Sequence, residues 1–259
     1  MSTGLVFLTG AASGIGQALA ARYAAAGWRL ALAVRKVEET SAWALAQGLG
    51  PERCRVYRAD VQDIDSIVDA GQRCIVEWGV PDVVIASAGI SIGMDTAVRA
   101  DLDVMRDTFA VNNTGLAATF HPFLSAMRVR RSGTLVGIAS VAAIRGLPGH
   151  GAYCASKAGV VAYCESLRGE CRGSGVRVVT LVPGYIATPL TARNRYAMPF
   201  LLQADAFAER AFRAIERGSS YRVIPWQMAV VAKLMRLLPN AWFDRLFAGR
   251  GHKRRRSET

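Results

Sequence analysis

The sequence predicts an α/β fold: a doubly wound, mainly parallel sheet of about seven strands, with helices on both faces. Short apolar runs recur along the chain and alternate with stretches of helical periodicity. A glycine-rich segment follows the first apolar run directly. The chain of 259 residues, with 51% apolar and 20% charged residues, is long and apolar enough to bury one full core. These three observations favour a single domain.

Seven apolar runs are the expected strands, namely residues 5–8, 29–34, 55–58, 82–86, 134–139, 176–182 and 221–225. Strands that alternate with helices form parallel sheets, and such sheets bind ligands at the carboxyl ends of their strands. No internal repeat or linker interrupts the pattern. We therefore expect residues 1–225 to form one domain with a ligand site at the carboxyl ends of its strands. Residues 226–259 would be a helical extension with a basic tail.

The glycine-rich segment reads Thr9-Gly-Ala-Ala-Ser-Gly-Ile-Gly16 and is followed by a predicted helix over 17–26. Glycines let the backbone approach a pyrophosphate, whose charge is met by free N–H groups and by the helix dipole. The position in the first strand–helix unit strengthens this interpretation. The candidate dinucleotide contacts in this segment are Gly10, Ser13, Gly14, Ile15 and Gly16.

A second motif combines Tyr153 and Lys157, which are four residues apart and so share one face of a helix. An ammonium beside a phenol stabilises the phenolate, so we expect the pKa of Tyr153 to fall by roughly one to three units. Ser140 follows the strand at 134–139 and can bring its hydroxyl to the same point. Such pairs are common on helices, so the motif gains weight only together with the glycine-rich turn.

Taken together, these motifs resemble the short-chain dehydrogenase/reductase family over residues 5–225. The resemblance implies that residues 1–225 form one dinucleotide-binding and catalytic domain of the Rossmann type. The resemblance implies that Asn112 completes a catalytic tetrad with Ser140, Tyr153 and Lys157, and that Tyr153 and Lys157 also contact the cofactor. It also implies contacts of the cofactor with Asp60, Val61, Ala88, Gly89, Pro183, Gly184, Ile186 and Thr188. The chain departs from the family at Ala86-Ser87, where asparagines are usual and tie adjacent strands together.

The residues after the second strand indicate which nicotinamide cofactor is preferred. Val34 stands where an acid would bind the ribose 2′-hydroxyl, and Arg35 and Lys36 follow it. Two cations would bind a 2′-phosphate, so we expect NADP(H) to be preferred over NAD(H). In the alternative interpretation both cations belong to a solvated loop.

The family resemblance implies hydride transfer between the nicotinamide and a carbonyl or secondary alcohol. Tyr153 would give the proton, Lys157 would bind the ribose, Ser140 would orient the oxygen and Asn112 would support a water chain. Residues 141–150 and 188–202 would select the substrate. The apolar side chains favour a lipophilic ketone or aldehyde, and Arg193 and Arg195 would suit one with an acidic group. In the alternative interpretation both arginines are simply solvated. The alternative function is a nucleotide sensor or scaffold without turnover.

Several other classes of protein are disfavoured. Five cysteines show no Cys-x-x-Cys pair and no histidine cluster, so we expect neither a disulfide framework nor a metal site. No leader-like segment precedes the first strand, which favours the cytoplasm. The basic tail lacks interleaved aromatic residues, so no specific nucleic-acid partner is expected. A small-residue face at Ala155, Ala158, Gly159 and Ala162 would allow a homodimer or homotetramer, as in the family.

The C-terminal end concentrates positive charge. Residues 233–259 carry eight Lys or Arg against two acids, giving +6 of the total net charge of +12. The apolar stretch over 226–238 is shorter than the ~20 residues that cross a bilayer. It could instead lie at the inner face of an anionic membrane with the tail at 252–256. The alternative is that the helices cover the substrate pocket and the tail is disordered.

Overall fold

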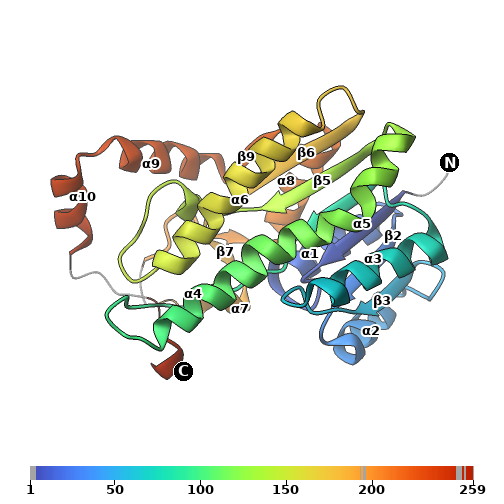
Figure 1. The fold of residues 1–259 in the computed structure, drawn as a ribbon, viewed down its shortest axis with the longest axis horizontal. Coiled ribbons are helices and arrows are strands. Elements are labelled where there is room, and N and C mark those ends of the chain that lie inside the picture. The colour runs from blue at the N-terminus through green and yellow to red at the C-terminus, as the bar shows by residue number, and fades with distance from the viewer. Residues whose placement is uncertain (1–3, 193, 195–196, 249–252, 254, 259) are drawn as a thin grey trace.

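The structure is a computed structural model that describes residues 4–192, 194, 197–248, 253 and 255–258. Within these residues seven parallel strands form one sheet in the order β3-β2-β1-β4-β5-β6-β9 (Figure 1). Their bounds are β1 Leu5–Thr9, β2 Arg29–Val34, β3 Cys54–Arg58, β4 Val83–Ala86, β5 Gly133–Ile138, β6 Val176–Pro183 and β9 Tyr221–Ile224. The predicted fold class is confirmed, and each strand end lies within one residue of its expected position.

Helices cover both faces of this sheet, and each face has its own apolar core. One layer contains α1 Gly14–Ala25, α2 Val37–Ala46 and α8 Ala204–Glu216. The other contains α3 Ile64–Trp78, α5 Gly115–Arg130 and α6 Gly151–Glu170. The strands are therefore apolar on both sides: Leu5 and Phe7 of β1 pack in one core, Val6 and Leu8 in the other.

The remaining elements lie around the carboxyl edge of the sheet or beyond its last strand. They are α4 Asp101–Phe109, the π-helix η1 Ala110–Thr114, the 3-10 turn η2 Val141–Ala143, β7 Ile186–Ala187, α7 Pro189–Ala192, β8 Leu202–Gln203, α9 Trp226–Leu237, α10 Asn240–Phe247 and the 3-10 turn η3 Arg256–Glu258. In the residues that the structure describes, no helix is both long and apolar enough to cross a membrane.

Helix α1 begins at Gly14, three residues before the predicted start at Gln17. The difference arises because the end of the glycine-rich turn is itself the first turn of the helix, in which the amide of Gln17 donates to the carbonyl of Ser13 over 3.2 Å. The helix N-terminus therefore directly follows the carboxyl end of β1. Its free N–H groups point at the edge of the sheet where a ligand is expected.

The C-terminal extension is fixed to the loop that follows β5. The guanidinium of Arg145 donates to the carbonyl of Leu238 at 2.6 Å and to that of Met235, and it lies 3.8 Å from the ring centroid of Phe243. The chain then returns to the sheet edge, where Arg255 forms an isolated parallel bridge with Gly93. In Figure 1 the final turn lies below α4, away from α10.

Candidate active site

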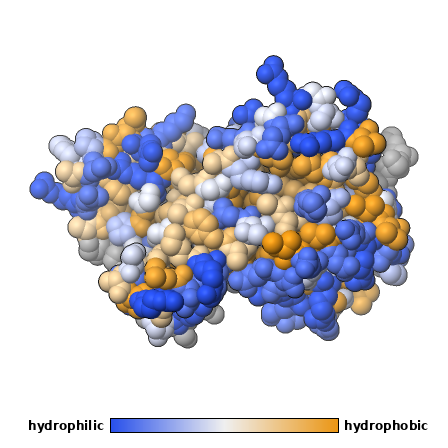
Figure 2. All heavy atoms as spheres, in the orientation of Figure 1, coloured by the Kyte–Doolittle hydropathy of each residue, from blue (hydrophilic) through white to orange (hydrophobic). Residues whose placement is uncertain are grey.

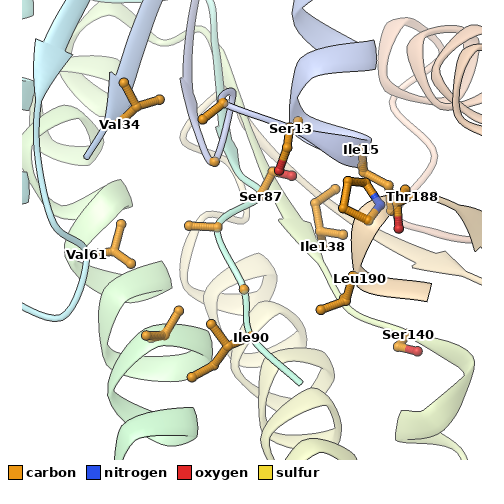
Figure 3. A pocket seen from close by; sticks show the side chains of 18 of the residues that line it. Ser13, Ile15, Val34, Val61, Ser87, Ile90, Ile138, Ser140, Thr188 and Leu190 are labelled. Carbon is orange, nitrogen blue, oxygen red and sulfur yellow. The ribbon is translucent and has the colours of Figure 1, made fainter. Parts of the chain in front are cut away.

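A cavity of about 540 Å³ lies along the carboxyl ends of the strands. Figure 3 shows Val34 and Val61 at one end of it, and Ser140 and Leu190 toward the other. The candidate cofactor residues of the sequence analysis all line this cavity, together with Ser140: Gly10, Ser13, Gly14, Ile15, Gly16, Arg35, Asp60, Val61, Ala88, Gly89, Tyr153, Lys157, Pro183, Gly184, Ile186 and Thr188. Segments far apart in the sequence therefore converge on one groove.

The glycines of the first turn are required by close approaches of the backbone. A Cβ on Gly16 would lie 2.2 Å from the carbonyl oxygen of Gly10, so any side chain there would separate α1 from the turn. Gly10 has φ +75°, and a Cβ there would lie 2.8 Å from the amide nitrogen of Ala88. These contacts keep the floor of the groove free of side chains, which fits a bound dinucleotide pyrophosphate.

Thr9 contacts the loop that follows Ala86-Ser87. Its hydroxyl, at the end of β1, accepts hydrogen bonds from the amides of Ser87 at 3.2 Å and Ala88 at 3.3 Å. Thr9 itself is almost fully buried. The threonine therefore ties β1 to the loop after β4.

Asn112 lies behind the groove, in the π-helix η1. Its side-chain oxygen accepts from the amide of Ile90 at 2.9 Å, and its nitrogen donates to the carbonyl of Ile90 at 3.0 Å and to the Ser156 hydroxyl at 2.9 Å. Short π-helical segments are frequent at functional sites. Asn112 thus fixes the loop after β4 to α6, the helix that carries Tyr153.

Tyr153 and Ser140 meet at the end of the groove. The Ser140 hydroxyl interacts with the phenol and lowers its pKa, but burial raises the pKa more strongly, and the net direction is upward. The expected fall in the pKa of Tyr153 is therefore wrong for this structure. The Nζ of Lys157 lies 5.9 Å from the centroid of the Tyr153 ring and donates to the carbonyl of Ile138 at 2.8 Å.

Lys157 is itself strongly perturbed. Its side chain is buried, and desolvation of the ammonium lowers its pKa from 10.5 to about 8. A Cβ on Gly89 would lie 3.4 Å from this amine, so the glycine leaves the space around it open. Perturbed lysines that line a cavity are typical of functional sites.

The far end of the groove carries the residues expected to select the cofactor. Arg35 follows β2, and its side chain is 70% exposed, with Nη1 3.8 Å from a carboxylate oxygen of Asp60. Lys36 instead binds Glu39 at 2.8 Å in the first turn of α2. Arg35 therefore extends over the groove with only a loose ion pair, whereas Lys36 is engaged along its own helix.

The loop after β6 closes the opposite wall. A Cβ on Gly184 would lie 2.7 Å from Cγ of Met228 in α9, and a Cβ on Gly14 would lie 3.4 Å from the Thr188 side chain. Thr188 is held by Thr191, whose hydroxyl accepts from the Thr188 amide at 3.0 Å. This loop therefore packs onto the glycine-rich turn on one side and onto the C-terminal extension on the other.

Parts of the expected substrate region lie outside the described residues, namely Arg193, Arg195 and Tyr196, and so does His252 of the basic tail. Leu190 lines the cavity and is 43% exposed. His150 is buried and contacts the carbonyl of Pro148 through Nδ1 at 2.9 Å, which fits a structural role. The described histidines, cysteines and acids form no group that could hold a metal ion.

Sequence reasoning missed several residues at the site. Ser87, Ile90 and Ile138 line the cavity, and so do Asp107 and Arg256, which pair with each other at 2.8 Å. Lys253 lies close by, with Nζ 5.9 Å from the centroid of the Tyr153 ring. Ser87 and Ile90 could have been predicted, because they follow the carboxyl end of a strand. For the tail residues, the sequence showed only a run of basic residues.

A glycine-rich turn opening α1, a groove along the strand ends and a Tyr–Ser–Lys group at its end define a dinucleotide-binding oxidoreductase fold and site. The comparisons identify the family. Residues 4–198 match the model of the short chain dehydrogenase family, so the chain belongs to it. It is an oxidoreductase that acts on an alcohol or carbonyl group with a nicotinamide cofactor.

Three similar proteins illustrate this relationship. An uncharacterized oxidoreductase of Myxococcus xanthus is 38% identical over 247 residues, covering 94% of this chain and 96% of that protein. A sulfoacetaldehyde reductase of Chromohalobacter salexigens is 36% identical and covers 73% of this chain and 75% of its own. The solved structure of a short chain dehydrogenase/reductase from Burkholderia phymatum in complex with NAD has a TM-score of 0.80 at 23% identity, covering 90% and 93%. This last likeness concerns the fold alone.

Proposed function

We propose that the protein is an NADP(H)-dependent reductase of a lipophilic ketone or aldehyde. The observation that carries this proposal is the convergence of Tyr153 and Ser140 at the end of the groove, beside the buried amine of Lys157. A proton donor and an orienting hydroxyl thus stand at one end of a site that fits a dinucleotide.

Each proposed role follows from the position of the side chain. When bound, the nicotinamide cofactor supplies a hydride to the carbonyl carbon. Ser140 donates a hydrogen bond to the substrate oxygen, and Tyr153 transfers its proton to that oxygen as the alcohol forms. Lys157 binds the ribose hydroxyls. Asn112 holds the loop after β4 in place and supports the water chain that returns a proton to Tyr153.

The pKa of Tyr153 supports reduction as the working direction. Because burial raises the pKa of the phenol, it favours the protonated form, which is the form that carbonyl reduction uses. Oxidation of an alcohol would need the phenolate as a base, and this form is disfavoured by the same burial. We therefore propose that carbonyl reduction is favoured near neutral pH.

A turnover screen with a Tyr153→Phe variant tests the function. We expect the wild-type protein to consume NADPH with at least one member of a panel of ketones and aldehydes, including sulfoacetaldehyde, the substrate named for one relative. Tyr153→Phe should lose more than ~10²-fold of kcat while its affinity for NADPH, measured by fluorescence, stays within about twofold. Undiminished turnover in Tyr153→Phe would refute the assignment. NADPH binding without turnover of any compound would favour the sensor or scaffold.

The preference for NADP(H) rests on Arg35, because Val34 leaves no acid to repel a 2′-phosphate. Removing a charge-assisted hydrogen bond to this phosphate, by Arg35→Ala, should lower the ratio of kcat/KM for NADPH over NADH by ~10- to 100-fold. Arg58→Ala is a matched control, since Arg58 pairs with Glu38 at 2.8 Å. A wild-type preference for NADH would overturn this part of the proposal.

We also propose peripheral contact with an anionic membrane through α9. This helix has two apolar faces: Met228 and Ala232 are buried, whereas one outward stripe is exposed and consists of Trp226, Val230, Leu234 and Leu237, 49–79% accessible. Lys233 and Arg236 are exposed on the same helix. Figure 2 shows hydrophobic and charged side chains side by side over this end of the molecule. The cations favour anionic lipid over a second, equally cationic copy.

Sedimentation with vesicles of phosphatidylcholine and phosphatidylserine tests this contact. Trp226→Ser combined with Leu234→Ser should weaken binding by roughly tenfold or more, because two large apolar side chains no longer enter the bilayer surface. Removal of residues 249–259 should have the smaller effect, since Lys253, Arg255 and Arg256 contact the chain itself. Absent vesicle binding, or a dimer that the double variant dissociates, would contradict the membrane proposal.

We further propose that α6 joins copies of the chain into a homodimer or homotetramer. Ala155 and Ala162 are exposed on this helix, whereas Gly159 packs within the chain, where a Cβ would lie 2.7 Å from the Asn113 amide. Ala162→Arg should shift the mass measured by light scattering toward the monomer. An unchanged mass would exclude this face.

A further inference from the structure

The C-terminal segment returns to the active site and is held there by ion pairs. Arg255 binds Asp101 at 2.7 Å, and the side chain of Asp101 is only 4% accessible. Arg256 binds Asp107 at 2.8 Å on the next turns of α4. The bridge between Arg255 and Gly93 adds a backbone contact to the loop after β4. The last residues therefore form part of the wall beside the site.

This arrangement places Lys253 next to the catalytic group. Its Nζ donates to the Ser91 hydroxyl at 2.9 Å and lies 5.9 Å from the centroid of the Tyr153 ring. Ser91 is buried and belongs to the loop that Asn112 fixes through Ile90. Lys253 thus lies on the Tyr153 side of the site, where a substrate would approach the phenol.

No carboxylate in the described part of the chain forms an ion pair with Lys253. Two described cations of the tail, Arg255 and Arg256, bind Asp101 and Asp107. The Lys253 amine is half-buried, and burial lowers its pKa to about 8 because the ammonium is poorly hydrated there. A poorly hydrated cation without an anionic partner is costly, and an anion beside it would remove the cost.

We propose that Lys253 binds an anionic group of the substrate, such as a carboxylate or sulfonate, while Tyr153 protonates its carbonyl oxygen. This inference rests on the proposed reductase function and specifies its substrate class. The loop that carries Ser91 is itself fixed, because Ile92 packs against the buried Met94 and the amide of Ala152 donates to the sulfur of Met94 at 3.2 Å. The site therefore suits a carbonyl compound that places its charge at Lys253.

Lys253 is not needed to hold the segment in place, because Arg255 and Arg256 and the bridge to Gly93 already do so. Replacing it should therefore change recognition without releasing the tail. This separation lets a specificity role be distinguished from a structural one. A purely structural lysine would affect charged and neutral compounds alike.

The test compares 4-formylbenzoate with 4-formylbenzamide, which have nearly the same shape and differ in charge. Both are titrated by calorimetry into the NADPH-loaded Tyr153→Phe protein, so that binding is measured without turnover. We expect 4-formylbenzoate to bind about tenfold more tightly or better, as a charge-assisted hydrogen bond would give. Adding Lys253→Met should abolish this preference, whereas Lys253→Arg should retain most of it.

Lys233→Met is the matched control, because Lys233 is exposed on α9 and its loss should leave the preference unchanged. The proposal is overturned if the protein does not prefer the carboxylate, including the case in which it binds neither compound. It is also overturned if the preference survives Lys253→Met. Failure of the reductase function would show differently, as a carboxylate preference in a protein that turns over no carbonyl compound.

Discussion

The cofactor half of the molecule and its C-terminal segment are organised by different kinds of contact. In the first, backbone meets backbone: Gly16 lies directly against Gly10, and strands that are distant in sequence continue one hydrogen-bonded sheet. In the second, single side chains join the chain end to α4, as Arg255 does with Asp101, 154 residues away. Backbone contacts tolerate only certain residue types, whereas ion pairs at the surface can be made by many sequences. Small substitutions should therefore disrupt the cofactor half more than they disrupt the C-terminal segment.

The largest effect expected from this contrast is that of Gly16→Ala. The added methyl would lie 2.2 Å from the Gly10 carbonyl oxygen and must push α1 away from the pyrophosphate position. We expect affinity for NADPH to fall by ~10²-fold or more, measured by fluorescence titration, together with a lower Tm. Gly169→Ala is the control, because a Cβ there meets nothing within 4 Å. Equal cofactor binding by the two variants would show that the turn is not as closely packed as described.

The glycine turn could be predicted from the spacing of its glycines, and the strands could be predicted from their apolar runs. The same holds for Tyr153 and Lys157, whose spacing places them on one face of α6, lining the cavity. The direction of the pKa of Tyr153 could not be predicted, since it depends on burial and on the Lys157 amine pointing at the Ile138 carbonyl. Spacing fixes which side chains are neighbours, but not their hydration or their hydrogen-bond partners.

Side-chain contacts between residues that are distant in the sequence could not be predicted either. Nothing in the sequence pairs the Thr9 hydroxyl with the amide of Ser87, although this bond ties β1 to the loop after β4. The basic tail predicted positive charge near the C-terminus, but not the particular acids on α4 that bind it. Such contacts require the three-dimensional path of the chain, because residues of opposite charge are plentiful and their pairing is decided by the fold.

The next largest effect is expected for the pH dependence of stability, and it comes from Lys157. This residue belongs to the cofactor half, yet its buried ammonium lowers the free energy of unfolding. Its pKa is lowered from 10.5 to about 8, so between these pH values the unfolded chain binds more protons than the folded one. Stability therefore rises with pH through this window, and the full penalty of the buried ammonium is present below pH 8. The shift corresponds to about 3 kcal/mol.

The measurement is the free energy of unfolding by urea of the wild type and of Lys157→Met, between pH 7.5 and 10.5. The stability of the variant relative to the wild type should be greatest at pH 7.5 and should decline as pH rises, because only the wild type gains from deprotonation of the amine. The lost hydrogen bond to Ile138 shifts this difference by a constant and leaves its slope intact. A difference that does not vary with pH would mean that Lys157 is hydrated in solution.

The smallest effect on the stability of the whole protein is expected for Asp101→Asn, which probes the C-terminal segment alone. Asparagine keeps an oxygen for the amide of Asp95, 2.8 Å away, and so removes only the charge that binds Arg255. Tm should change little, while trypsin should cut after Lys253 or Arg255 severalfold faster, because the freed segment spends more time away from α4.

Asp103→Asn on the same helix is the control, since Asp103 pairs with Arg99 and Arg106 rather than with the tail. If both variants were cut at the wild-type rate, contacts other than this ion pair would hold the segment. The comparison between a backbone-defined half and a side-chain-tethered end would then no longer hold.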